Sequence, residues 1–112
     1  MFETQEKLEQ IIMEKSLICN HDPDGSLLKQ YLNSQILTRK FTGVGFFTEF
    51  LIPDHLIIND ESKNFCEVSG RYEDSDIIFI FVIFIKSGKL DFLEGFTSHG
   101  EWRYDYENMI LF

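Results

Sequence analysis

The stretch "DIIFIFVIFIKSGKLDFLEGFT" (residues 76–97) contains two strand-like segments joined by a tight-turn signal. The first segment, 76–86, carries apolar residues on both of its alternating faces, a pattern typical of a strand in the middle of a sheet. Ser87 and Gly88 suit a two-residue hairpin turn, so the second segment, 89–97, should return antiparallel. This hairpin predicts a β-sheet at the centre of the fold.

β-Branched and aromatic residues in period-two patterns predict further strands on both sides of this hairpin. The segment 43–52 ends at Pro53, which is typical of a strand end. Shorter patterns predict strands at 55–58 and 64–72, and the C-terminal segment 104–111 is a further candidate. Together with the hairpin, these segments predict a sheet of about five strands.

The N-terminal third of the chain has helical periodicity instead. Apolar residues recur at helical spacing between charged ones over residues 3–18, which predicts an amphipathic helix. Asp22 as a cap and Pro23 at the first helical position predict a second helix over 23–37. Two helices followed by hairpin-linked strands predict an α+β fold in one domain (residues 1–112), with both helices packed on one face of an antiparallel meander sheet.

The charge balance is strongly acidic. Nineteen Asp and Glu residues against ten Lys and Arg residues give a net charge of −9, which repels nucleic-acid backbones and anionic membranes. We therefore expect no nucleic-acid and no membrane partner. Such a surface attracts a basic protein partner, although acidity also serves solubility alone. The candidate partner-binding residues lie in acidic segments of the second half of the chain: Glu61, Glu73, Asp74, Asp76 and Glu101.

Several features predict a cytoplasmic protein without a metal or a cofactor. Cys19 and Cys66 are far apart and form no C-x-x-C motif, which favours two free thiols in a reducing compartment. The longest apolar run, 77–85, is too short to span a membrane, and the polar N-terminus is unlike a signal peptide. "HDPDG" (residues 21–25) lacks the glycine and glutamate positions of a calcium loop, and no catalytic motif is present.

Two carboxylates on otherwise apolar strand faces are the main candidate site. Regular pairing outward from the hairpin turn places Phe81 opposite Glu94, within an aromatic face. Glu49 likewise shares a strand face with Phe47. Two such carboxylates could converge in a Phe-lined pocket as a general acid/base pair. The alternatives are lone carboxylates at the sheet rim and ion pairs with Arg71 or Arg103.

The loop after the hairpin, "TSHGEW" (residues 97–102), supplies two more candidates for ligand binding. His99 and Trp102 at a strand exit are typical of a ligand rim or an interaction hot spot. The alternative is an ordinary loop whose Trp folds back over the sheet edge. Glu94, His99 and Glu101 are metal-ligand types, but nothing in the sequence fixes their relative positions, so we expect no metal site.

Two blocks resemble a family of small bacterial proteins. The blocks are "FTGVGFFTEF" (residues 41–50) and "GKLDFLEGFTSHGEW" (residues 88–102). They are similar to a G-x-G-F-F-T strand and a late L-E-G-[FY]-T strand followed by E-W in that family. Together with the helical N-terminus, the resemblance covers about half of the chain and implies a compact α+β domain. It implies no activity, substrate or catalytic residue. By size and charge alone, the chain is also similar to toxin-immunity proteins.

These observations favour a non-enzymatic, immunity-like protein-binding module that engages a basic partner through an acidic surface. The alternative is a small-molecule-binding protein or minor enzyme with a Phe-lined pocket that uses Glu49 and Glu94. A third hypothesis is a homodimer built through the second, partly apolar face of the sheet.

Overall fold

The computed structural model describes residues 2–19, 22, 25–59, 65–72, 77–97 and 109–112, and these form helices and strands of an α+β fold, as predicted. The helices are α1 (Phe2–Cys19), α2 (Ser26–Leu32) and the short 3-10 helix η1 (Asp54–Leu56). The strands are β1 (Gln35–Phe41), β2 (Gly45–Leu51), β3 (Phe65–Tyr72), β4 (Phe79–Lys86), β5 (Lys89–Thr97) and β6 (Met109–Leu111).

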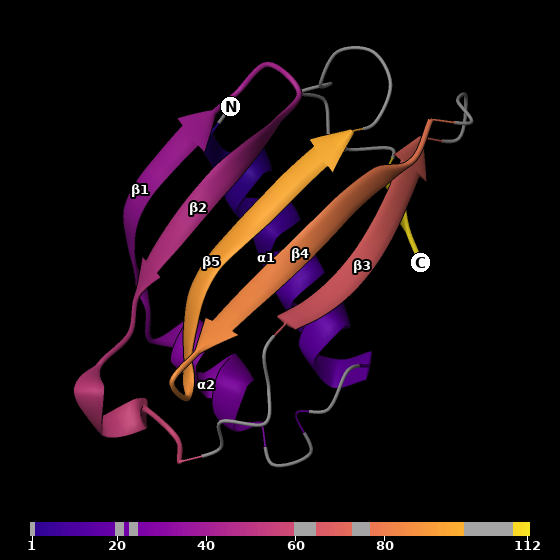
Figure 1. The fold of residues 1–112 in the computed structure, drawn as a ribbon. Helices are drawn as coiled ribbons and strands as arrows, with labels where there is room; N and C mark the ends of the chain where they lie inside the picture. The colour runs from indigo at the N-terminus through magenta and orange to yellow at the C-terminus, as the bar shows by residue number, and fades with distance from the viewer. Residues whose placement is uncertain (1, 20–21, 23–24, 60–64, 73–76, 98–108) are drawn as a thin grey trace.

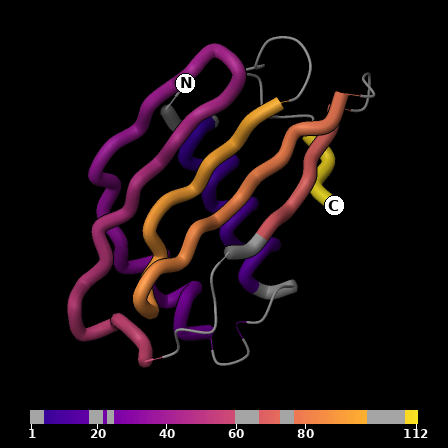
Figure 2. Tube along the Cα trace, in the orientation of Figure 1, coloured from indigo at the N-terminus to yellow at the C-terminus, as the bar shows by residue number. Residues whose placement is uncertain are grey.

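The six strands form one antiparallel sheet in the order β1-β2-β5-β4-β3-β6. β3, β4 and β5 are consecutive neighbours, as in the predicted meander, but β2 pairs with β5 instead of β3. The chain therefore crosses the width of the sheet after β2. Figure 1 shows the β1–β2 hairpin beside β5, and Figure 2 shows the C-terminal segment beside β3. The order departs from a simple meander because pairing between distant strands leaves no local signal.

Both helices lie on one face of the sheet, as predicted. In Figure 1, α1 runs obliquely behind the strands and α2 lies near the turn between β4 and β5. α1 contacts β3 and β4, and α2 contacts β5. No helix in the described part of the chain is long and apolar enough to cross a membrane. The core between the two layers includes Leu8, Ile12, Met13, Leu17, Leu27, Phe46, Phe50, Phe79, Phe81, Ile83, Leu90 and Leu93.

The second helix is shorter than predicted and is followed by a strand that the sequence did not predict. The helix begins at Ser26 with Gly25 as its N-cap, instead of at residue 23 with Asp22 as the cap. The Asp22 carboxylate still accepts the N–H groups of Leu27 (2.9 Å) and Leu28 (3.0 Å) in the first turn. The helix ends at Leu32 instead of residue 37, and residues 35–37 begin β1. β1 is held by its pairing with β2, and this tertiary contact overrides the local helical spacing.

The turn between β4 and β5 has the predicted two residues. Ser87 and Gly88 both have positive φ (53° and 75°), as in a type I′ turn. A Cβ added to Gly88 would lie 1.7 Å from the carbonyl oxygen of Ile58, so this close approach requires glycine. The buried amide of Gln30 fastens α2 to the same turn. It donates to the carbonyls of Leu56 and Gly88 and accepts the N–H of Leu90, all at 2.9 Å.

A β-bulge changes the predicted register of this hairpin. Pairing next to the turn is as predicted, but Asp91 is an extra residue on β5, and every later pair is displaced by one residue. Val82 rather than Phe81 therefore lies opposite Glu94. Because a one-residue displacement moves a side chain to the other face of the sheet, the predicted placement of Glu94 beside Phe81 is wrong.

The predicted strand at 55–58 is also wrong, because the chain forms η1 there. Pro53 follows the end of β2, and its carbonyl accepts the N–H of Leu56 (3.0 Å). The carbonyl of Asp54 accepts the N–H of Ile57 (3.2 Å). These local bonds replace those of a strand ladder. Of the candidate strand 104–111, only β6 lies within the described residues.

Candidate functional site: the open face of the sheet

The face of the sheet opposite the helices is covered by no element of the described part of the chain, and we call it the open face. Side chains alternate along each strand, so one set points to the helices and the other to the open face. The register aligns the open-face residues in three rows across the sheet. The members with described side chains are Thr38, Glu49, Phe92 and Phe84; Lys40, Phe47, Glu94, Val82 and Glu67; and Phe96, Ile80 and Ser69.

Three half-buried phenylalanines form a continuous ladder across the middle of the open face. The ring of Phe92 stacks on Phe84, with centroids 4.4 Å apart and planes 21° from parallel. Its other neighbour is Phe47, with centroids 5.6 Å apart. Each such pair contributes about 0.5–1.5 kcal/mol beyond the burial of its area. We call Phe47, Phe92 and Phe84 the Phe ladder.

Both carboxylates predicted from the sequence lie on the open face. Glu49 shares that face with Phe47, as predicted, and is exposed. Thr38 Oγ1 donates a hydrogen bond of 2.9 Å to Glu49 Oε1. Glu94 is half-buried and pairs with Phe47 on β2 and Val82 on β4. Within the described residues, Glu94 has no hydrogen bond or ion pair.

The Phe ladder separates these two carboxylates. Glu49 lies opposite Phe92 and Phe47 lies opposite Glu94, so the four side chains occupy the corners of a square. The rings of Phe47 and Phe92 meet along one diagonal, and the carboxylates occupy the ends of the other. This arrangement gives no support to an acid/base pair that shares one substrate atom.

The cations of the open face lie around its periphery. Lys40 is on the edge strand β1, Arg71 is on β3, and Lys86 and Lys89 flank the β4–β5 turn. Among the described residues, neither Glu49 nor Glu94 forms an ion pair with any of them, so the predicted partnership with Arg71 is not observed. The centre of the open face thus combines aromatic rings with carboxylates.

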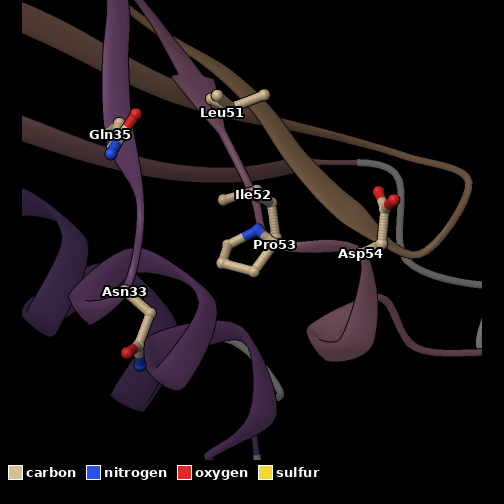
Figure 3. A pocket seen from close by; sticks show the side chains of 6 residues that line it. All are labelled: Asn33, Gln35, Leu51, Ile52, Pro53 and Asp54. Carbon is tan, nitrogen blue, oxygen red and sulfur yellow. The ribbon is translucent and has the colours of Figure 1, made fainter.

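A shallow depression of about 340 Å³ lies elsewhere, between the start of β1 and the end of β2 (Figure 3). Its lining side chains come from two sides: Asn33, Gln35, Leu51, Ile52, Pro53 and Asp54. It contains neither Glu49 nor Glu94 and no phenylalanine, so it does not correspond to the predicted Phe-lined pocket.

The sequence did not reveal a buried ionic cluster beneath β1 and β2. Glu9 is 1% exposed, and its carboxylate accepts hydrogen bonds from Gln5 (2.8 Å), Thr48 (2.5 Å) and two nitrogens of Arg39 (2.6 and 3.0 Å). The hydrogen bond to Glu9 raises the pKa of Arg39 above its usual value. Burial and the nearby Glu9 raise the pKa of Tyr31 to about 12. The one sequence signal was the position of Gln5 and Glu9 one turn before the buried Leu8 and Ile12.

The remaining predicted site residues lie outside the described part of the chain: His99, Trp102, Glu61, Glu73, Asp74, Asp76 and Glu101. Among the described residues, no group of three or more His, Cys, Asp or Glu side chains is placed to hold a metal ion. No family model matches the chain, and no curated protein or solved structure matches it significantly. The resemblance carried by residues 41–50 and 88–102 stays a prediction.

Proposed function

We propose that this chain is a non-enzymatic protein-binding module that engages a basic partner protein through the open face. The observation that supports it best is the Phe ladder, half-exposed at the centre of a sheet face and flanked by Glu49 and Glu94. In the finer form of the proposal the module is immunity-like, and the basic partner is a toxin that it neutralises.

The aromatic content of the open face supports a protein interface. Contiguous half-exposed apolar side chains on a sheet face are typical of interaction surfaces, and aromatic residues are enriched at interface centres. The ladder is already ordered by its own ring contacts. A partner therefore gains apolar contact while little side-chain entropy is lost on binding.

The carboxylates determine the chemistry of the partner. Covering the open face removes Glu49 and Glu94 from water, and a desolvated carboxylate without a cation is strongly unfavourable. The cations of the open face are peripheral, so the partner must bring its own. Arginine suits the site, because its planar guanidinium stacks on a ring and pairs with a carboxylate through two hydrogen bonds. The net charge of −9 adds long-range attraction for such a partner.

A second copy of the chain does not supply the cations that Glu49 and Glu94 need when the open face is covered. Stacking two open faces about a two-fold axis along β5 would bring the two Glu94 carboxylates together. Like charges in a desolvated interface cost several kcal/mol by order of magnitude. The open face therefore fits a basic partner better than itself.

The experiment compares E49Q/E94Q with a control that loses the same two charges elsewhere, E14Q/D54N. The partner captured by the wild-type protein from lysate is identified by mass spectrometry, purified and titrated against all three proteins by calorimetry. We expect E49Q/E94Q to weaken binding about tenfold or more at low salt, and the control to stay within about twofold. An acidic partner, or equal affinity for E49Q/E94Q and wild type, would overturn the proposal. Protection of growth when both genes are co-expressed tests the immunity-like form.

A further inference from the structure

The edge strand β1 is a second surface that the open face does not explain. β1 pairs with β2 alone in the described sheet and lies at its outer edge (Figure 1). Three of its apolar side chains are exposed: Ile36 by 39%, Leu37 by 54% and Phe41 by 46%. A long exposed edge strand with apolar side chains is a template for pairing with another strand. The opposite edge, β6, has only three residues.

The charges of β1 protect this edge less than the sequence suggests. Arg39 turns beneath the sheet, where Glu9 neutralises it at 2.6 Å. Lys40 is therefore the free cation of β1 among its described residues. Lysines on edges normally oppose pairing, unless the incoming strand offers them a carboxylate.

The hydrogen-bonding phase of β1 shows which residues face outward. Thr42 N–H donates to the carbonyl of Gly45 at 2.9 Å at the β1–β2 turn, and Lys40 pairs with Phe47. Hydrogen-bonded and non-hydrogen-bonded pairs alternate along an antiparallel ladder, so Lys40 and Phe47 are a hydrogen-bonded pair and Arg39 and Thr48 are not. The backbone N–H and C=O of Arg39 therefore point away from β2. An added antiparallel strand would therefore bond to Arg39.

We propose that β1 pairs antiparallel with β1 of a second copy of this chain, about a two-fold axis at Arg39. This register places Lys40 opposite Thr38 of the second copy. Thr38 donates to Glu49 Oε1, which holds the Glu49 carboxylate beside Thr38 and leaves its other oxygen to accept the incoming Lys40. The two-fold axis produces two such Lys40–Glu49 pairs.

Charge complementarity selects this register and this occupant. A two-fold axis one residue further along, at Lys40, would oppose two unpaired ammonium groups, which is destabilising. The proposed axis opposes the two Arg39 side chains instead, and Glu9 neutralises each of them. In the proposed register each copy supplies both the lysine and the carboxylate, so no other partner is required. Two antiparallel edges joined in this way form one continuous sheet with both open faces on the same side. The inference goes beyond the proposed function, because it concerns another surface.

The test is sedimentation equilibrium of the full chain up to about 1 mM, because an interface limited to one strand edge is small and weak. Salt of about 0.15 M screens the repulsion between two chains of net charge −9. We expect a reversible dimer. K40E should raise the Kd of the dimer about tenfold, because both Lys40–Glu49 attractions become repulsions. The charge swap K40E/E49K should bring the Kd back to within about threefold of the wild-type value. The matched control K7E, which makes the same charge change on α1, should leave the Kd within about twofold.

Circular dichroism and urea unfolding of each variant confirm that it is folded. A monomer over the whole concentration range overturns the proposal, as does a dimer that K40E leaves unchanged. A folded K40E/E49K that stays monomeric overturns the register. Partner binding by the open face is measured separately, so a failure here is distinguishable from a failure of the proposed function.

Discussion

Replacing Arg39 by Met should expose the energetic role of the buried cluster beneath β1. The change keeps an apolar stem of similar length and removes the two charge-assisted bonds to Glu9, at 2.6 and 3.0 Å. Glu9, 1% exposed, would keep only the bonds from Gln5 and Thr48. A buried charge that loses its partner costs about 3–5 kcal/mol, and the two remaining donors favour the lower end, about 3 kcal/mol.

The assay is urea unfolding of four proteins: wild type, R39M, E9Q and E9Q/R39M. If R39M is destabilising because it leaves a buried charge unpaired, it should cost only about 1 kcal/mol when residue 9 is already the neutral Gln. The coupling energy between the two changes should therefore be about 2 kcal/mol. A cost of R39M that is equal in both backgrounds to within about 0.5 kcal/mol would refute this reasoning. A changed m-value would instead indicate an altered unfolded or native state.

Two further predictions concern α2. Gln30→Leu leaves the Leu90 N–H and the Leu56 carbonyl without their buried partner. It should therefore lower the free energy of unfolding, measured by urea titration, by about 2–3 kcal/mol. A loss below about 0.5 kcal/mol would contradict this prediction. The pKa of Tyr31 is raised from 10.0 to about 12, so the folded protein holds the phenolic proton more tightly than the unfolded chain does. The folded state therefore loses stability as the pH rises from about 10 to about 12. The unfolding free energy of wild type relative to Tyr31→Phe should therefore fall by about 1 kcal/mol, after allowance for solvent screening, between pH 8 and pH 12; a pH-independent difference would argue against it.

Local signals in the sequence predicted the elements that local contacts stabilise. The span of α1 and the turn at Ser87 and Gly88 were predicted correctly, because helical spacing and turn chemistry act within a few residues. β1 was missed because its stability comes from β2 and from the contact of Arg39 with Glu9, thirty positions away. Neither contact leaves a local pattern.

The candidate site was predicted in part for the same reason. Alternation along one strand correctly placed Glu49 on the face of Phe47. The position of Glu94 depended on pairing between two strands, and the extra residue Asp91 moved it to the opposite face. The second face was expected to be partly apolar, but the Phe ladder itself was not foreseen, because its ring contacts depend on the pairing of β2, β5 and β4.

The clamp made by Gln30 also constrains the order in which the chain acquires its structure. Gln30 lies in α2, a helix of only seven residues, and its partners stand at positions 56, 88 and 90. A nascent chain exposes α2 to water long before those partners have been synthesised. β2 likewise gains its neighbour β5 only when residues 92–96 are available. Contacts of such long sequence separation slow folding, so α2 and β2 should acquire their final packing only after the residues up to position 96 have left the ribosome.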